Sequence, residues 1–134
     1  MNDFSAVLKV TIKDKTFLFP GDSNKIVAKA LLKNYSAATL KVDVLQAAHH
    51  LYNDLDGLYA AVQPTYVMCP QSKLRAQSTP LAAFVTLQKY VPDERFFFAG
   101  ENTVYGFTPQ SDGSISICEI PVDCGGFDGT YPGS

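Results

Sequence analysis

Apolar side chains recur at every second position in residues 5–12, which predicts a strand with one apolar face. Lys13 and Asp14 form a candidate turn, and the β-branched and aromatic residues 16–19 predict the returning strand. Pro20 ends the pairing of this strand because proline has no N–H to donate. The chain is therefore expected to open with a pair of adjacent strands.

The next segments predict two strand–helix–strand units. Residues 25–35 have the periodicity of an amphipathic helix, and the apolar residues 42–45 predict a buried strand. A shorter helix at residues 54–62 leads into a further strand at residues 65–69, and the side chains of this helix that are expected to be buried are Leu55, Leu58, Tyr59 and Val62. Because a crossover helix joins parallel strands, we expect the strands at residues 16–19, 42–45 and 65–69 to end at the same edge of one sheet.

The sequence also predicts which face of the first helix is buried and which elements follow residue 69. The buried stripe of the first helix is expected at Ile26, Ala30, Leu31 and Tyr35. The later elements are a helix from Thr79-Pro80 to about residue 90, a strand at residues 95–99, and a pair of strands at residues 103–107 and 114–120. Polar loops are expected at residues 36–41 and 70–78. These elements indicate one α/β domain over residues 1–120, followed by a glycine- and proline-rich tail at residues 121–134.

Composition excludes several classes of protein. The formal net charge is −2 and the 11 basic residues are scattered, so no nucleic-acid footprint is evident. No apolar run approaches the roughly 18 residues of a membrane span, and the N-terminus does not have the pattern of a signal peptide. The three cysteines, Cys69, Cys118 and Cys124, are an odd number without metal-site spacing, which favours a reducing, cytoplasmic location.

The candidate chemistry lies where the predicted parallel strands end. Asp22 follows the second strand, and His49 and His50, the only histidines, follow the third. A carboxylate and an imidazole at one edge are suitable ligands for zinc. Asp22 could instead cap the following helix, and along an extended backbone the two histidines would point in opposite directions. Cys69, at the end of the next strand, is either a small buried hydrophobe or a nucleophile beside His50.

These motifs resemble a known family. Pro20-Gly21-Asp22 and His49-His50-Leu51-Tyr52, with the strands and helix between them, resemble the second half of metallo-β-lactamase-fold hydrolases, and the competence-protein type most of all. The resemblance implies half of an αββα sandwich, a mixed sheet with helices packed on one face. It also implies that Asp22 and His50 bind zinc, with His49 beside them or facing substrate, and that the metal activates water for hydrolysis.

The chain also departs from the family pattern. The family's main His-x-His-x-Asp-His ligand motif is absent, Leu51-Tyr52 replaces a Gly-Ser pair, and Gln77 replaces a later histidine. Catalytic zinc normally has three protein ligands, whereas Asp22 and one histidine supply two. We therefore expect the isolated chain neither to hold zinc tightly nor to catalyse hydrolysis.

Two hypotheses follow. In the first, the chain is a fragment or split-gene product that becomes a metal-dependent hydrolase when an N-terminal half completes it. In the second, it is a non-catalytic module that binds a partner or a second copy, because the face of the sheet that the missing half would cover is apolar. Phe96, Phe97 and Phe98 are the aromatics expected to form that apolar patch.

Overall fold

The computed structural model describes residues 5–78, 81–100 and 103–121. The strands are β1 (Leu8–Ile12), β2 (Lys15–Phe19), β3 (Val44–Gln46), β4 (Tyr66–Cys69), β5 (Phe96–Phe98), β6 (Thr103–Pro109) and β7 (Ile115–Pro121). The α-helices are α1 (Lys25–Asn34), α2 (Ala37–Leu40), α3 (Asp56–Val62), α4 (Lys73–Ser78) and α5 (Ala82–Leu87). Two 3-10 helices, η1 (Ala48–Leu51) and η2 (Asp93–Arg95), complete these elements.

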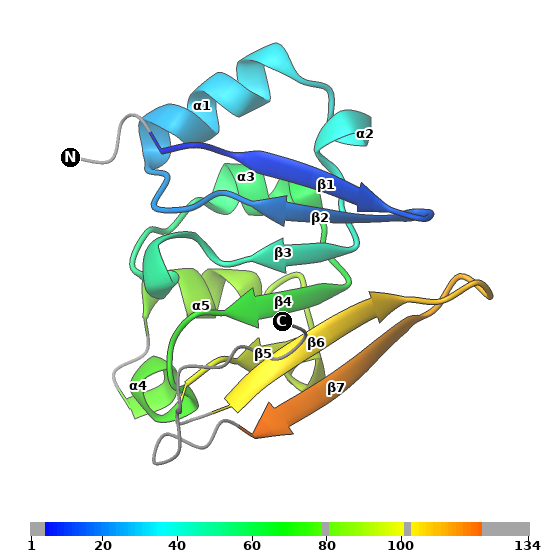
Figure 1. Cartoon of the computed structure of the whole chain (residues 1–134). Coiled ribbons are helices and arrows are strands. Elements are labelled where there is room, and N and C mark those ends of the chain that lie inside the picture. The colour runs from blue at the N-terminus through cyan, green and yellow to red at the C-terminus, as the bar shows by residue number, and fades with distance from the viewer. Residues whose placement is uncertain (1–4, 79–80, 101–102, 122–134) are drawn as a thin grey trace, which may run out of the picture.

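The strands form a mixed five-stranded sheet and a separate hairpin (Figure 1). The five-stranded sheet has the order β1-β2-β3-β4-β5, and β6 pairs with β7. β1 and β2 are antiparallel across the two-residue turn at Lys13 and Asp14, whereas β2, β3, β4 and β5 are parallel neighbours. The predicted α/β class and the parallel crossover units are therefore confirmed.

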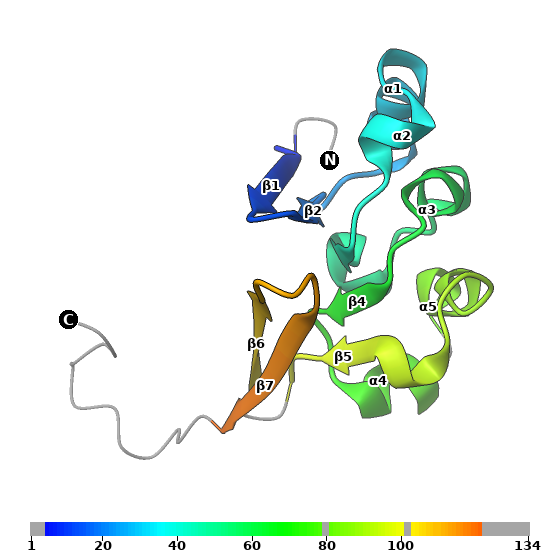
Figure 2. The ribbon, with the colours of Figure 1, turned by 90° about the vertical axis from the view of Figure 1, so that its right-hand side faces the viewer.

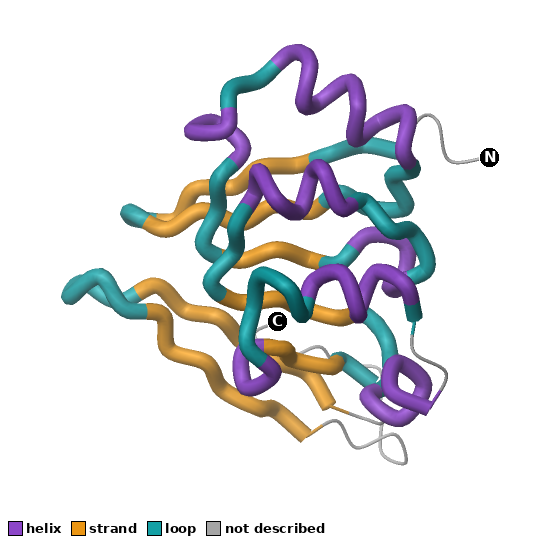
Figure 3. The backbone as a smooth tube through the Cα atoms, turned by 180° about the vertical axis from the view of Figure 1, so that it is seen from behind, coloured by secondary structure: helices purple, strands orange, loops and turns teal. Residues whose placement is uncertain are grey.

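Among the residues that the structure describes, helices cover only one face of the five-stranded sheet (Figures 2 and 3). We call this the helix-covered face and the opposite one the helix-free face. Leu18, Leu45, Val67 and Phe96 are aligned across four strands and belong to the hydrophobic core on the helix-covered face. Because side chains alternate along a strand, the residues on either side of each of these point to the helix-free face.

The β6–β7 hairpin lies against the helix-free face near β4 and β5 (Figure 2). The ring of Phe97 on β5 contacts Tyr105 and Phe107 of β6, with ring centroids 5.3 and 5.4 Å apart. Phe96 and Phe98 instead contact Phe84 of α5 on the helix-covered face. The expected apolar patch of Phe96, Phe97 and Phe98 is therefore wrong, because α5 and the hairpin cover these three rings from opposite sides.

The predicted burial is correct for α3 and wrong for α1. Leu58, Tyr59 and Val62 of α3 are completely buried. On α1, Ile26 and Tyr35 are exposed, and Ala28 is the buried residue, with Leu31 packed beside the core. Apolar residues occur around most of α1, so their spacing does not identify the face that packs against the protein.

Two short helices replace the loops expected at residues 36–41 and 70–78. Each helix follows a serine whose hydroxyl accepts a backbone N–H bond. Ser36 accepts from Thr39 at the start of α2, and Ser72 accepts from Arg75 at the start of α4. A capping serine indicates a helix in each segment, although the polar composition of these segments suggested a loop. The predicted helix start at Thr79-Pro80 and most of the predicted tail lie outside the described residues.

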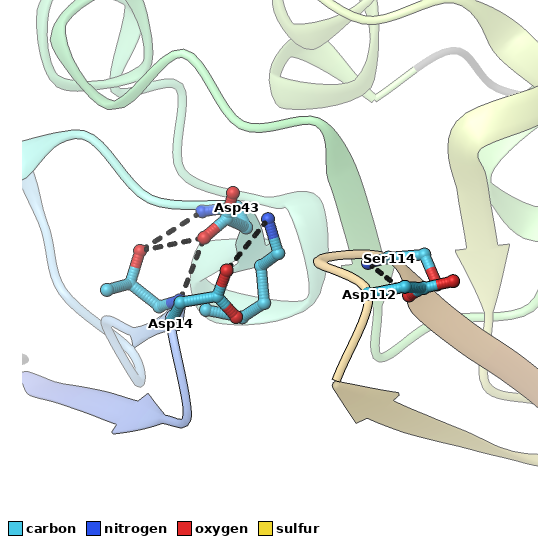
Figure 4. Close-up of polar contacts among 6 residues, drawn as sticks. Asp14, Asp43, Asp112 and Ser114 are labelled. Carbon is cyan, nitrogen blue, oxygen red and sulfur yellow. Dashed lines mark hydrogen bonds and ion pairs between the residues drawn. The ribbon is translucent and has the colours of Figure 1, made fainter. Parts of the chain in front are cut away.

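Asp43 fixes the amino-terminal ends of three neighbouring strands (Figure 4). Its carboxylate accepts bonds from the backbone N–H and the hydroxyl of Thr16, at 2.8 and 3.2 Å. Its backbone N–H donates to the carbonyl of Thr16, and its carbonyl accepts from Thr65 and Tyr66. A slip of one residue would exchange the two faces of a strand, so this set of bonds helps to decide which side chains enter the core.

Candidate functional site at the carboxyl edge of the sheet

The segments that follow β2 and β3 are hydrogen-bonded to one another at the carboxyl edge of the sheet. The backbone N–H of His49 donates to the carbonyl of Gly21 at 3.0 Å. The amide of Asn53 donates to the carbonyl of Ser23 at 2.8 Å. The segment that carries Asp22 therefore lies against the one that carries both histidines, as the parallel strands predicted.

The loop after β3 has an unusual backbone. His49, His50 and Leu51 have φ values of 46, 51 and 70°, so three successive residues without glycine adopt left-handed conformations. Each such residue costs about 1–3 kcal/mol, and the conformation persists only where the surrounding structure holds it in place. Burial of Leu51 and a bond from the N–H of Tyr52 to the carbonyl of His49 hold the turn here. The extended backbone expected for His49 and His50 is therefore wrong.

A hydrogen bond defines the protonation of the neutral His50 ring. Its Nδ1 lies 2.9 Å from the carbonyl oxygen of Pro70, at the end of β4. A carbonyl oxygen can only accept, so Nδ1 carries the hydrogen and Nε2 of the neutral ring is unprotonated. Histidines that bind metals commonly donate their other ring N–H in this way. The exposed His50 ring therefore has one nitrogen suited to a ligand.

His49 is the more enclosed of the two histidines. Its ring contacts those of His50 and Tyr52, with centroids 6.2 and 5.8 Å apart. Its Nδ1 is buried and has no hydrogen-bond partner within the described residues. Oδ1 of Asp54 is in the same situation, and Asp54 lies with Tyr52 beside a hollow of about 430 Å³ next to the start of α1.

Asp22 is an exposed residue of the turn after β2. The N-cap of α1 is Asn24, whose side-chain oxygen accepts from the N–H groups of Ile26 and Val27 at 2.9 and 3.2 Å. The alternative interpretation of Asp22 as the helix cap is therefore wrong. Its carboxylate remains on the surface beside the segment of His49, with Gly21 supplying the positive φ of the turn.

Cys69 belongs to the hydrophobic core. Its side chain is completely buried on the helix-covered face, and burial raises the pKa of the thiol far above its ordinary value. Nucleophilic attack requires the thiolate, which this environment disfavours. Of the two interpretations of Cys69, the structure favours the small buried hydrophobe.

Two residues that position the loop after β3 were not predicted from the sequence. Pro70 supplies the acceptor for His50, and Asn53 joins the loop to the segment after β2. The phenol of Tyr59 donates to the carbonyl of Asn53 at 3.3 Å, and burial raises the pKa of Tyr59, so it stays protonated. The position of Pro70 directly after a predicted parallel strand was the available signal.

The residues that the structure describes do not complete a zinc site. Within the part of the chain that the structure describes, no group of three or more His, Cys, Asp or Glu residues could hold a metal ion. Catalytic zinc normally takes three protein ligands and a water. Among the described residues, Asp22 and Nε2 of His50 would supply two donors at most, so a metal at this edge would need ligands from outside that part of the chain.

Comparison of the chain with known protein families, with curated proteins and with solved structures finds no match. The resemblance to metallo-β-lactamase-fold hydrolases therefore depends on the sequence motifs around Asp22 and His50. None of the helices in residues 5–78, 81–100 and 103–121 is long and apolar enough to cross a lipid bilayer.

Proposed function

We propose that this chain is a protein-binding half-domain whose helix-free face docks a second polypeptide. The observation that carries the proposal is the exposure of Leu8, Val10 and Ile12, at 60, 36 and 46%. We call these three residues the β1 stripe. They alternate with Lys9 and Thr11 and lie on the helix-free face, because Leu18, which pairs with Lys9, belongs to the core on the other face.

The hairpin leaves the β1 stripe uncovered. Its aromatic rings contact Tyr66 and Phe97, on β4 and β5, which lie at the opposite edge of the sheet from β1. Phe17 and Val44 in the intervening strands are buried, so among the described residues of the five-stranded sheet the large exposed apolar side chains are those of β1. Covering the stripe with a second polypeptide would contribute about 3 kcal/mol, since a fully buried aliphatic side chain gains about 1.5–3 kcal/mol.

The test of this proposal compares two double variants. Leu8→Thr/Ile12→Thr makes two of the three residues of the β1 stripe polar with threonine, which is β-branched and suits a strand, and Val104→Thr/Ile120→Thr makes the same change at an exposed pair on the hairpin. We expect the wild type to self-associate or to bind a dye that fluoresces on apolar surfaces, and the first variant to lose both properties at an unchanged melting temperature. An effect confined to the hairpin variant would contradict the proposal.

A second candidate function is that of a partial metal-dependent hydrolase. The unprotonated Nε2 of His50, on the same edge as Asp22, favours it. In this proposal the missing ligands come from an N-terminal half, and zinc would supply an activated water there. Titration calorimetry should then detect zinc binding when a histidine-rich first-half chain is added, and His50→Ala should abolish it. Absence of binding in the mixture would contradict this candidate.

A further inference from the structure

We propose that the polypeptide that docks at β1 is a second copy of this chain, with β1 of each copy paired antiparallel about a two-fold axis at Val10, so that the two β1 stripes contact each other side by side. This inference rests on the proposed function and names its partner. Among the described residues β1 pairs only with β2, and all five of its residues are exposed. An edge strand of this kind can add another strand through its free backbone groups.

The register of the β1–β2 hairpin shows which backbone groups are free. Ile12 and Lys15 close the two-residue turn, so Ile12, Val10 and Leu8 direct their N–H and C=O groups toward β2. The groups of Lys9 and Thr11 therefore point away from the sheet. When two β1 strands pair about Val10, Lys9 of one copy lies opposite Thr11 of the other, and each such pair exchanges both backbone hydrogen bonds.

The positions of the lysines favour this register over the two in which the axis lies one residue away. A two-fold axis at Lys9 would place that lysine opposite itself, and an axis at Thr11 would place Lys9 opposite Lys13 of the second copy. Like charges directly opposite one another destabilise a strand pair. An axis at Val10 avoids both arrangements. Lys9 is also engaged elsewhere, since its ammonium donates to the carbonyl of Thr39 on the helix-covered face.

The side chains are self-complementary in the same register. Leu8 of one copy lies opposite Ile12 of the other, and Val10 lies opposite Val10, so the two stripes join into one apolar surface. Charged residues and prolines are the usual protection of an exposed edge strand; β1 has one such residue, Lys9, whose ammonium is bound to Thr39 on the helix-covered face, and the β1 stripe has none. A second copy is therefore an occupant that matches every position of the stripe with an apolar partner.

The predicted interface is small. Five residues from each copy bury less than the roughly 1,200 Å² typical of stable complexes, so we expect a reversible dimer that dissociates on dilution. The dimer would form one continuous sheet with both helix layers on the same side. The two carboxyl edges that carry Asp22 and His50 would remain open to solvent at its ends.

Complementary charges at the axis test the inference. Val10→Lys and Val10→Glu each place like charges opposite one another, so each variant alone should dimerise about tenfold or more weakly than the wild type. An equimolar mixture should recover dimers, since lysine then faces glutamate. Sedimentation equilibrium measures the masses, and circular dichroism checks that each variant is folded. Val104→Lys, an equivalent change on the hairpin, should leave the dimer intact.

The outcomes separate this inference from the proposed function. A monomeric wild type that binds the apolar-surface dye through the β1 stripe would overturn the second copy as occupant and leave the docking face standing. Dimers that persist in both Val10 variants, or a mixture that stays monomeric, would overturn the pairing about Val10. If the charged variants do not fold, Val10→Cys should form a disulfide-linked dimer on oxidation in a Cys118→Ser/Cys124→Ser background. Failure to form that link would also overturn the pairing.

Discussion

The two faces of the five-stranded sheet are built from the same strands but are covered in different ways. On the helix-covered face, Leu18, Leu45 and Val67 are almost completely buried under the helices. On the helix-free face, the hairpin covers the side near β4 and β5, and the β1 stripe stays exposed. Within the described residues, one face of the sheet is thus covered throughout, whereas the other is covered only near β4 and β5.

Because of this difference, apolar residues of the two faces should contribute to different properties, folding of the single chain on one face and binding of another surface on the other. Apolar residues under the helices contribute to folding of the single chain, because unfolding exposes them to water. Apolar residues of the β1 stripe are already in water and contribute little until another surface covers them. The same residue type should therefore have different effects on the two faces, which direct comparisons of variants can measure.

The largest expected difference comes from the same substitution on each face. Leu45→Ala on the helix-covered face should lower the free energy of unfolding by about 2–5 kcal/mol, because it leaves a cavity in a packed core. Leu8→Ala, at an exposed position of β1, should change it by less than about 0.5 kcal/mol. Urea denaturation at a low protein concentration measures both. Equal losses would show that the helix-free face is covered within the monomer.

The next largest effect concerns the register that assigns residues to the two faces. Asp43→Ala removes the acceptor for both donor groups of Thr16 and should lower the free energy of unfolding by about 1–3 kcal/mol. Asp43→Asn retains an amide oxygen that can accept from the N–H of Thr16, so it should cost less. Thermal or urea denaturation of the two variants gives the comparison, and equal losses would contradict the role assigned to the hydrogen bonds.

A smaller effect is expected where the hairpin covers the helix-free face. Phe107→Ala removes ring contacts with Tyr66 and Phe97 and should lower the free energy of unfolding by about 1–2 kcal/mol, since Phe107 is only half-buried. Hydrogen exchange should speed up in β6 and β7 and stay slow in β3. Unchanged exchange in the hairpin would show that these contacts do not hold it against the sheet.

The fold was predicted well from the sequence where the pattern of apolar residues is compatible with a single structure. Alternating apolar residues with a short turn gave the β1–β2 hairpin, and the buried positions of α3 followed from their spacing. Prediction failed where two solutions fit equally well. The apolar residues of α1 permit several buried faces, and the tertiary structure chose the one with Ala28.

The candidate site shows the same limit. Strand order placed the segments of Asp22 and His50 at one edge, because parallel strands end together. The left-handed turn at His49, His50 and Leu51 was not predictable from residue type, since glycine or asparagine usually occupies such positions. The turn depends on burial of Leu51, a long-range contact that the local sequence does not specify.

The smallest expected effect is a loosening of the hairpin at low pH that the helix-covered face does not share. In the β6–β7 turn, Asp112 accepts bonds from the hydroxyl and the N–H of Ser114 at 2.6 and 3.0 Å, and these bonds hold the pKa of Asp112 below its ordinary value (Figure 4). Since the folded pKa is lowered, the stabilisation is present above the ordinary value and is lost as the pH falls through the lowered one. Acidification below about pH 4 should therefore loosen the hairpin before it affects the helix-covered face.

Amide exchange at Ser114 would measure this loosening, and Asp112→Asn should remove its pH dependence because the amide does not titrate. An identical acid response in that variant would assign the effect to another carboxylate.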